Sequence, residues 1–244
     1  MTLTVPCLFG LESLVADEMR RLDLKNVRAE NGRVHCDGTL ADIARLNINL
    51  RCGARVLMEL GSFPARDFEA LFQGVYALPW EDYIPRDGEF PVKGYSLNSQ
   101  LHSVPACQAI VKKASAKRLG EKYGLETLPE SGSRYQIQFS IIKDVATLYL
   151  DTSGEGLYKR GYRAKNMGAP LRETLAAALV TLSRYRGKDP FCDPFCGSGT
   201  IPIEAALIAK NRAPGLDRSF AAQKWKNMDS KLWLEAGDEA MDKE

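Results

Sequence analysis

The sequence predicts an α+β protein followed by the opening of an α/β domain. Three observations lead to this fold class. Short β-type segments and amphipathic α-type segments alternate through residues 1–150. The pair Asn31-Gly32 is the favoured turn of a two-residue β-hairpin. From residue 169 onward, a helical pattern is followed by a short apolar run, a glycine-containing turn and a second helical pattern.

Residues 1–63 predict a ferredoxin-like domain. A strand signal at residues 3–5 precedes a helix at 11–22, whose apolar side chains recur at helical spacing. The hairpin over 27–36 comes next, and then a second amphipathic helix at 40–50 and a strand at 55–60. This order of strands and helices fits one helical layer on a small sheet.

Residues 64–155 predict a second α+β domain. A helix covers residues 68–75 and ends at Pro79-Trp80. We expect further elements as a strand at 90–95, a strong helix at 107–123, and strands at 135–142 and 145–150 that meet at Lys143-Asp144. Residues 156–168 combine glycines with basic residues, so we expect a basic linker there.

Residues 169–244 predict the opening of a Rossmann-like, doubly wound domain. The expected order is a helix at 171–184, a strand at 190–193, the glycine turn at 193–200 and a helix at 200–210. A parallel sheet needs several strands and only one can be found, so we expect this domain to be incomplete in the chain. The acidic end, 235–244, is expected to be frayed.

Composition excludes several classes of protein. The 244 residues are 45% hydrophobic and 26% charged, and no apolar run approaches the roughly 20 residues that cross a bilayer. The N-terminus lacks the pattern of a secretory signal. None of the six cysteines forms a C-x2-C pair, and only His35 and His102 could add imidazole ligands. We therefore expect a cytoplasmic protein with reduced thiols, no metal site and no membrane partner.

The net charge of +2 conceals an asymmetry. Residues 91–165 hold 12 Lys and Arg against 6 Asp and Glu, whereas residues 1–90 hold 10 against 14. A basic segment of this kind indicates either a polyanion-binding face or a solvated lysine-rich surface.

The turn from Asp193 to Thr200 has the residue types of a ligand site. Asp193 offers a carboxylate to an ammonium group, and Gly197 and Gly199 let the backbone bend sharply and approach a ligand. The helix that begins at Thr200 presents free N–H groups to a carboxylate. These groups are complementary to both the ammonium group and the carboxylate of an amino-acid zwitterion. A glycine turn with a purely structural role is the alternative interpretation of the same residues.

Two phosphate-binding motifs that also contain glycine turns are excluded. A P-loop requires a lysine directly after its last glycine, and Thr200 occupies that position. The dinucleotide fingerprint requires a third glycine where this chain has Pro202.

The turn and its continuation through Ala206 resemble motif I of class I methyltransferases that modify exocyclic amino groups of nucleobases. The segment 169–178 is similar to the helix before that motif. Upstream, residues 99–114 and 143–163 resemble the THUMP domain, an RNA-binding module. Together these segments resemble the bacterial THUMP-containing RNA methylases, which are related to the large-subunit ribosomal RNA guanine-N2 methyltransferases.

This resemblance implies S-adenosylmethionine as cofactor and RNA, in particular ribosomal RNA, as partner. It implies cofactor-binding residues at Asp193, Pro194, Phe195, Cys196, Gly197, Ser198, Gly199 and Thr200, with Arg172 and Glu173 as neighbours. The RNA-binding candidates are Lys93, Lys112, Lys113, Lys117, Lys159, Arg160 and Arg163. Base stacking is possible at Tyr95, Tyr158 and Tyr162, for which ordinary packing is the alternative. Glu204 is expected to anchor the turn rather than to act as a catalytic base.

One motif of the family is absent from the sequence. Family members carry a later Asn/Asp-Pro-Pro-Tyr-type motif that holds the target amino group, and no such sequence occurs in this chain. The acidic residue that binds the cofactor's ribose in the family, on the second strand, is also expected to lie beyond the end of this chain. We therefore expect no catalytic residue here, a fragment of a longer enzyme, weak cofactor binding and no methyl transfer. A non-catalytic RNA-binding module and a DNA adenine-N6 methyltransferase are the two alternatives.

Overall fold

The computed structural model describes residues 1–163 and 170–244, which form two compact units. The first unit contains residues 1–56, 153–223 and 228–244, and the second contains residues 57–152 and 224–227. The expected linker at 156–168 and the start of the third domain at residue 169 fall partly outside the described residues.

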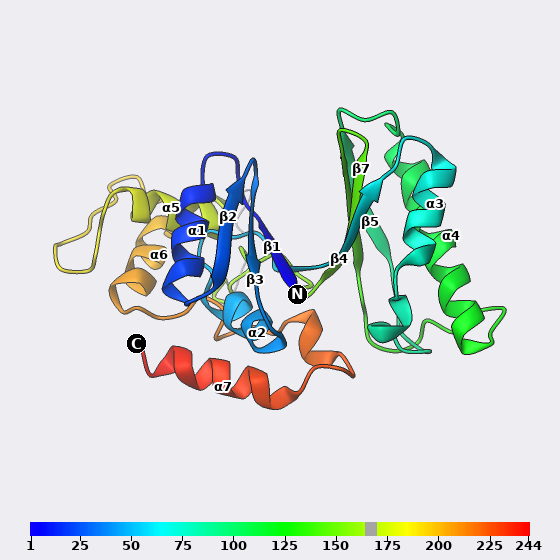
Figure 1. Cartoon of the computed structure of the whole chain (residues 1–244). Helices are drawn as coiled ribbons and strands as arrows, with labels where there is room; N and C mark the ends of the chain where they lie inside the picture. The colour runs from blue at the N-terminus through cyan, green and yellow to red at the C-terminus, as the bar shows by residue number, and fades with distance from the viewer. Residues whose placement is uncertain (164–169) are drawn as a thin grey trace. The chain divides into compact units, whose positions relative to one another are not determined.

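The N-terminal part of the first unit is a small antiparallel sheet with helices (Figure 1). Strand order β2-β3-β1 is fixed by pairing of β3 with both neighbours, and Gly32 turns the predicted hairpin at a φ of 75°. Thr39 caps the second helix through a capping box with Asp42. The elements are β1 (Thr2–Pro6), α1 (Glu12–Arg21), β2 (Lys25–Glu30), β3 (Arg33–Asp37) and α2 (Leu40–Asn49).

The second unit is a four-stranded sheet with two long helices. Strands lie in the order β4-β7-β6-β5, and only the β5–β6 pair is parallel among the strand pairs described for this unit. Helices α3 and α4 pack against each other, as Figure 1 shows. The elements are β4 (Leu57–Pro64), α3 (Phe68–Ala77), the 3-10 helix η1 (Trp80–Asp82), β5 (Val92–Leu97), α4 (Val104–Tyr123), β6 (Ile137–Ile142) and β7 (Val145–Asp151).

The predicted β6–β7 hairpin is confirmed. Lys143 and Asp144 are its two loop residues, and both adopt left-handed backbone angles, with φ values of 51° and 63°. Two successive left-handed residues form the type I′ turn, whose twist matches that of paired strands. The strand expected at 55–60 is β4, which pairs with β7 within this second unit.

A short segment from the C-terminal region belongs to the second unit. The ring of Trp225 stacks on Tyr135 with centroids 5.0 Å apart, and its Nε1 donates to the carbonyl of Arg134 at 2.9 Å. Lys226 pairs with Asp87 at 2.8 Å. These contacts anchor residues 224–227 on the sheet of this unit.

The C-terminal part of the first unit is helical. The two predicted helices are found as α5 and α6, which pack together, but residues 190–193 form no strand. A strand exists only when its backbone groups pair with a neighbour, and no strand is present among the described residues after Asp151. The prediction of a strand before the glycine turn is therefore wrong for this chain. The elements are α5 (Glu173–Leu182), α6 (Thr200–Ala209), the 3-10 helix η2 (Ala221–Lys224) and α7 (Ser230–Met241).

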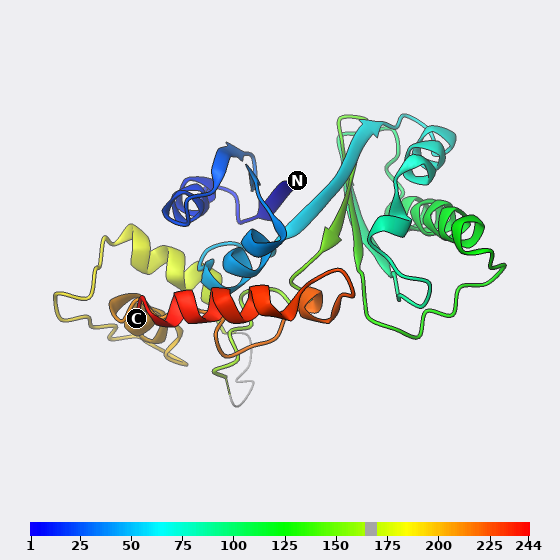
Figure 2. The ribbon, with the colours of Figure 1, turned by 60° about the horizontal axis from the view of Figure 1, so that its bottom comes forward.

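The prediction of a frayed acidic end is also wrong. Helix α7 continues to Met241, and it buries Trp233, Ala236 and Ala240, which recur at helical spacing. It packs against α2 (Figure 2). At this contact Nε and Nη2 of Arg45 donate to the carboxylate of Glu239 at 2.9 and 3.1 Å. No helix of the described chain is long and apolar enough to span a membrane.

Candidate functional site

The glycine turn has the backbone conformation that the sequence predicts. Gly197 and Gly199 have φ values of 53° and 76°, and the amide of Gly199 donates to the carbonyl of Cys196 at 2.8 Å. One carboxylate oxygen of Asp193 accepts from the amide of Phe195 at 3.1 Å. Gly199 is the residue before α6 and offers no side chain as a cap, so the first amides of α6 remain available to a ligand. The turn therefore combines a carboxylate and free amides at one place.

The side chains of the turn are largely accessible. Phe195 is 94% exposed, so its ring is not packed into the core of the described chain. A Cβ atom added at Gly197 would meet no other atom of the described chain within 4 Å, so there is open space beside this residue. Thr200, the last residue of the turn and the first of α6, is buried.

Arg163 joins the turn to the start of α5. Its Nε donates to the carboxylate of Glu173, and its Nη2 and Nη1 donate to the hydroxyls of Thr200 (2.5 Å) and Ser198 (3.3 Å). The sequence analysis named Arg163 as a candidate for RNA binding. In the structure its guanidinium instead donates hydrogen bonds to side chains of the turn. The predicted proximity of Glu173 to the turn is consistent with this arrangement.

A cavity of about 950 Å³ adjoins these residues within the first unit. Its walls contain five of the predicted site residues: Lys159, Arg160, Arg163, Arg172 and Glu173. The sequence analysis did not identify Asp217, Arg218 and Ser219, which also line this cavity. Arg218 donates to the backbone carbonyls of Glu155, Gly156 and Lys159 at 2.7–2.9 Å, and so fixes the basic segment. No periodicity or motif surrounds residues 217–219, so the sequence carried no signal for them.

Aromatic rings also face this cavity. Tyr158 and Tyr162 line it, and the guanidinium of Arg172 lies 5.4 Å from the ring centre of Tyr158. The hydroxyl of Tyr162 donates to Glu204 at 3.0 Å, and burial followed by the nearby Glu204 raises the pKa of this phenol. Tyr162 is therefore fixed by a hydrogen bond and also lies beside a cation, because the guanidinium of Arg163 is 6.0 Å from its ring centre.

Arg160 does not have the position expected of an RNA contact. Its side chain is 2% exposed, and its Nε lies 3.4 Å from Oε1 of Glu204. Its other donors reach the carbonyls of Leu157 (2.8 Å) and Arg51 (2.5 Å). A guanidinium engaged with buried oxygens is withdrawn from solvent, so the assignment of Arg160 to RNA is wrong. Burial raises the pKa of Glu204, whose position in α6 supports the expectation that it anchors the turn.

The lysines of the second unit divide into two groups. Lys113 and Lys117 are exposed on α4, and their ammonium groups lie 6.0 and 5.9 Å from the ring centre of Phe72. Lys112 instead pairs with Glu130 at 2.6 Å and lies over the ring of Phe90. The sequence placed all three lysines on one basic surface, but the contacts of Lys112 remove it from that surface.

The remaining RNA candidates are at the surface. Lys93 is exposed on β5, and Lys159 is exposed and pairs with Glu155 at 2.6 Å. Within residues 1–163 and 170–244, no group of three His, Cys, Asp or Glu side chains could hold a metal ion.

Three family models match successive parts of the chain. The RlmL ferredoxin-like domain matches residues 2–57, the THUMP domain matches 65–151, and the RMKL-like methyltransferase domain matches 160–242. The chain combines these three domains. The model of the methyltransferase domain covers the glycine turn and the residues of the adjoining cavity.

Longer curated relatives align with almost the whole chain. The chain is 44% identical over 244 residues to the Bacillus subtilis protein named Putative RNA methyltransferase YpsC, covering 99% of this chain and 63% of the relative. It is 35% identical to the Psychromonas ingrahamii ribosomal RNA large subunit methyltransferase K/L, covering 94% of this chain and 31% of that protein. The chain thus spans less than two thirds of the length of these relatives.

Solved structures show the same fold. A Listeria monocytogenes protein described as a predicted N6-adenine-specific DNA methylase is 49% identical, with a TM-score of 0.95, over 99% of this chain and 64% of that one. The structure of SMU.472 complexed with SAH is 43% identical, with a TM-score of 0.93, again over 99% of this chain and 64% of that one.

Proposed function

We propose that this chain binds S-adenosylmethionine at the Asp193–Thr200 turn and RNA through its THUMP domain, within an enzyme that methylates RNA. The observation that carries the proposal is the turn itself, in which two left-handed glycines precede a helix with free first amides. The similarity to SMU.472, whose structure holds SAH, supports the choice of cofactor.

The residues of the turn fit the amino-acid end of this cofactor. The free amides at the start of α6 would donate hydrogen bonds to its carboxylate, and the oxygen of Asp193 that does not bind Phe195 would accept a hydrogen bond from its ammonium group. The open space beside Gly197 permits close approach of the ligand. When bound, the cofactor supplies a methyl group on a sulfonium, and the protein contributes positioning. Arg163 would hold Ser198 and Thr200 in place during binding.

We propose an exocyclic base nitrogen of ribosomal RNA, in particular guanine N2, as the methyl acceptor. The relatives named ribosomal RNA large subunit methyltransferase K/L support a ribosomal substrate. We further propose that residues 64–155 bind RNA and that transfer requires a segment of the longer relatives, because no Asn/Asp-Pro-Pro-Tyr sequence occurs in this chain.

A DNA adenine methyltransferase is the second candidate, and the description of the Listeria monocytogenes structure favours it. The THUMP match over residues 65–151 favours RNA instead. Competition binding separates the two: a labelled structured RNA bound by the chain is challenged with unlabelled RNA or with duplex DNA of equal length. We expect only RNA to displace the probe efficiently, and equal displacement by duplex DNA would contradict the RNA assignment.

A further inference from the structure

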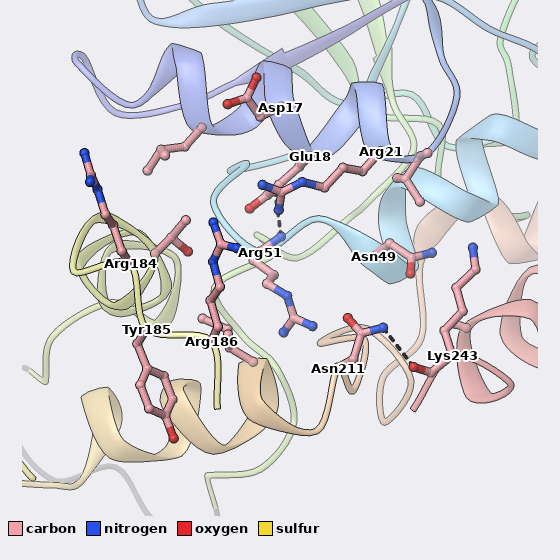
Figure 3. Close-up of a pocket in the computed structure, with 15 residues that line it drawn as sticks. Asp17, Glu18, Arg21, Asn49, Arg51, Arg184, Tyr185, Arg186, Asn211 and Lys243 are labelled. Carbon is pink, nitrogen blue, oxygen red and sulfur yellow. Dashed lines mark hydrogen bonds between the residues drawn. The ribbon is translucent and has the colours of Figure 1, made fainter. Parts of the chain in front are cut away.

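A second cavity of the first unit, with a volume of about 660 Å³, has a strongly cationic wall (Figure 3). Its positively charged residues come from four parts of the chain: the end of α1, the segment after α2, the segment after α5 and the C-terminus. They are Arg21, Arg51, Arg184, Arg186 and Lys243, and the acidic residues of the wall are Asp17 and Glu18. Neither the glycine turn nor the cavity beside it shares a residue with this wall.

The two acidic residues are engaged elsewhere. Asp17 pairs with Arg20 at 2.8 Å. Oε2 of Glu18 accepts from the backbone amides of Arg51 (3.0 Å) and Cys52 (3.2 Å), and burial raises the pKa of this carboxyl. Neither carboxylate forms a described hydrogen bond with a guanidinium that lines the cavity. The wall therefore holds more basic than acidic side chains, and Glu18 compensates the charge of Arg51 only in part.

Arg51 is the side chain that distinguishes this cavity from an ordinary basic surface. Its Nη1 is buried and has no hydrogen-bond partner in the described part of the chain. Burial lowers the pKa of Arg51, although Glu18 and Glu204 oppose this effect. A buried guanidinium nitrogen without an acceptor costs free energy, and an anionic ligand would supply that acceptor.

Two further arginines share the cavity with Arg51. In Figure 3 the side chains of Arg51 and Arg186 extend into the space below α1, Arg21 lies along α1, and Arg184 points away from them. Arg21 and Arg186 are exposed, and no acidic side chain among the described residues pairs with either. Lys243 is already paired with Glu239 at 2.6 Å. The available positive charge is thus that of Arg21, Arg51 and Arg186.

We propose that this cavity binds a phosphodiester group of the RNA substrate through Arg21, Arg51 and Arg186. Guanidinium groups match the oxygens of phosphate with paired N–H donors. The volume lies within the range of about 300–1,000 Å³ found for sites that hold a small molecule, so a nucleotide unit fits where a bare ion would leave most of the space empty. Asn49, Tyr185 and Asn211 add polar groups to the same wall. The choice of RNA as the source of the phosphate rests on the proposed function.

The test uses exposed residues, because changing Arg51 could unfold the chain. Arg21→Gln combined with Arg186→Gln removes two charges from the cavity. Lys25→Gln combined with Lys188→Gln removes two exposed charges of the same unit that do not line it. Equal melting temperatures of the two double variants show that both are folded. Fluorescence anisotropy then measures the dissociation constant of a labelled structured RNA across a salt series.

We expect Arg21→Gln with Arg186→Gln to weaken RNA binding about tenfold and to reduce the slope of log K against log salt by about one, relative to the lysine control. Equal affinities and slopes in the two double variants would overturn the inference while leaving RNA binding itself intact. If the unaltered chain binds no RNA, the proposed function fails instead.

Inorganic phosphate distinguishes the two sources of the ligand. One outcome would overturn the assignment to RNA. In that outcome, phosphate alone raises the melting temperature of the unaltered chain but not of the Arg21→Gln, Arg186→Gln variant, and the two chains bind RNA with equal affinity. The cavity then binds a free phosphate compound, and the assignment to RNA is overturned. Competition between phosphate and RNA for the unaltered chain, lost in the arginine variant, is the result that the inference expects.

Discussion

Arg160 and Glu204 form a buried ion pair, with 3.4 Å between Nε and Oε1. Glu204 lies one turn into α6, directly after the glycine turn, and Arg160 belongs to the basic segment before α5. Tyr162 donates to the same carboxylate oxygen at 3.0 Å. The pair therefore connects α6, which begins at the candidate cofactor site, to the basic segment that lines the adjoining cavity.

Removal of Arg160 should destabilise the first unit strongly. Arg160→Ala removes the cationic partner of Glu204 and the side-chain donor to the carbonyls of Leu157 and Arg51, and loss of one partner of a buried pair costs about 3–5 kcal/mol. Urea denaturation measures the free energy of unfolding. The control Lys159→Ala changes an exposed neighbour and should stay within about 0.5 kcal/mol of the unaltered chain. A similarly small effect of Arg160→Ala would show that the pair is not structural.

Arg163 should stabilise the conformation of the glycine turn. Arg163→Gln removes the charged donors to Glu173, Ser198 and Thr200, so we expect faster hydrogen exchange at the amides of residues 198–200 and about tenfold weaker binding of SAH. Exchange is followed by mass spectrometry and affinity by calorimetry. Lys159→Gln is the control, because Lys159 lines the same cavity and has no described contact with the turn. Unchanged exchange at the turn would contradict this role.

Local patterns in the sequence predicted the elements that depend on local interactions. The helix expected at 107–123 and the hairpin at Lys143-Asp144 were found, because helical spacing and turn residues act over a few positions. Residues 190–193 were wrongly predicted as a strand, because pairing depends on neighbours that their own sequence does not reveal. The burial of Arg160 depends on Glu204, which lies 44 positions away, so charge patterning could not reveal it.

The site was predicted in part for the same reason. The backbone of the turn follows from Gly197 and Gly199, and its conformation was predicted correctly. The role of Arg163 depends on a fold that brings residue 163 beside Ser198 and Thr200. A signal for α7 was present, since Trp233, Ala236 and Ala240 recur at helical spacing, but the acidic composition of the segment obscured it.

Glu81 should make the stability of the second unit depend on pH in the acid range. Its two carboxylate oxygens accept from Arg118 at 2.5 and 3.0 Å, and this pairing lowers the pKa of Glu81 from 4.5 to about 2. A carboxyl with a lowered pKa stabilises the folded state above its unfolded pKa, and that stabilisation is lost as the pH falls through the folded value. Glu81→Gln should therefore cost about 1–2 kcal/mol near neutral pH, and the difference should shrink as the pH falls from about 4.5 toward 2.

Urea denaturation of the unaltered chain and of Glu81→Gln at a series of pH values measures this difference. Glu126→Gln changes an exposed carboxyl of the same unit and serves as the control. A difference between the Glu81 variant and the unaltered chain that stays constant down to the lowest pH would show that Arg118 does not stabilise the charged form of Glu81.

Lys113 and Lys117 should contribute to RNA binding where Lys112 does not. Both ammonium groups lie beside Phe72 on the exposed side of α4, and Lys117 has only a long, exposed contact with Glu121 at 3.9 Å, whereas Lys112 pairs with Glu130 at 2.6 Å. Lys113→Gln combined with Lys117→Gln should lower the slope of log K against log salt by up to about two, and Lys112→Gln should leave it unchanged. Filter binding across a salt series gives both slopes. A larger effect of Lys112→Gln than of the double variant would place the RNA on a different face.

Gly197 offers the sharpest test of whether the turn binds a ligand or only connects two segments. Gly10 has the same kind of backbone, with a φ of 89° against 53° for Gly197, and at either position an added Cβ atom would meet no atom of the described residues within 4 Å. Alanine at each glycine should therefore cost a similar free energy of unfolding, about 1 kcal/mol, because the strain arises from the left-handed backbone alone. A ligand seated on the turn would meet the new methyl group only at residue 197. We expect Gly197→Ala to weaken SAH binding at least tenfold in calorimetry while Gly10→Ala leaves it unchanged. Equal SAH affinities in the two variants would mean that the turn has no ligand and is a structural connection.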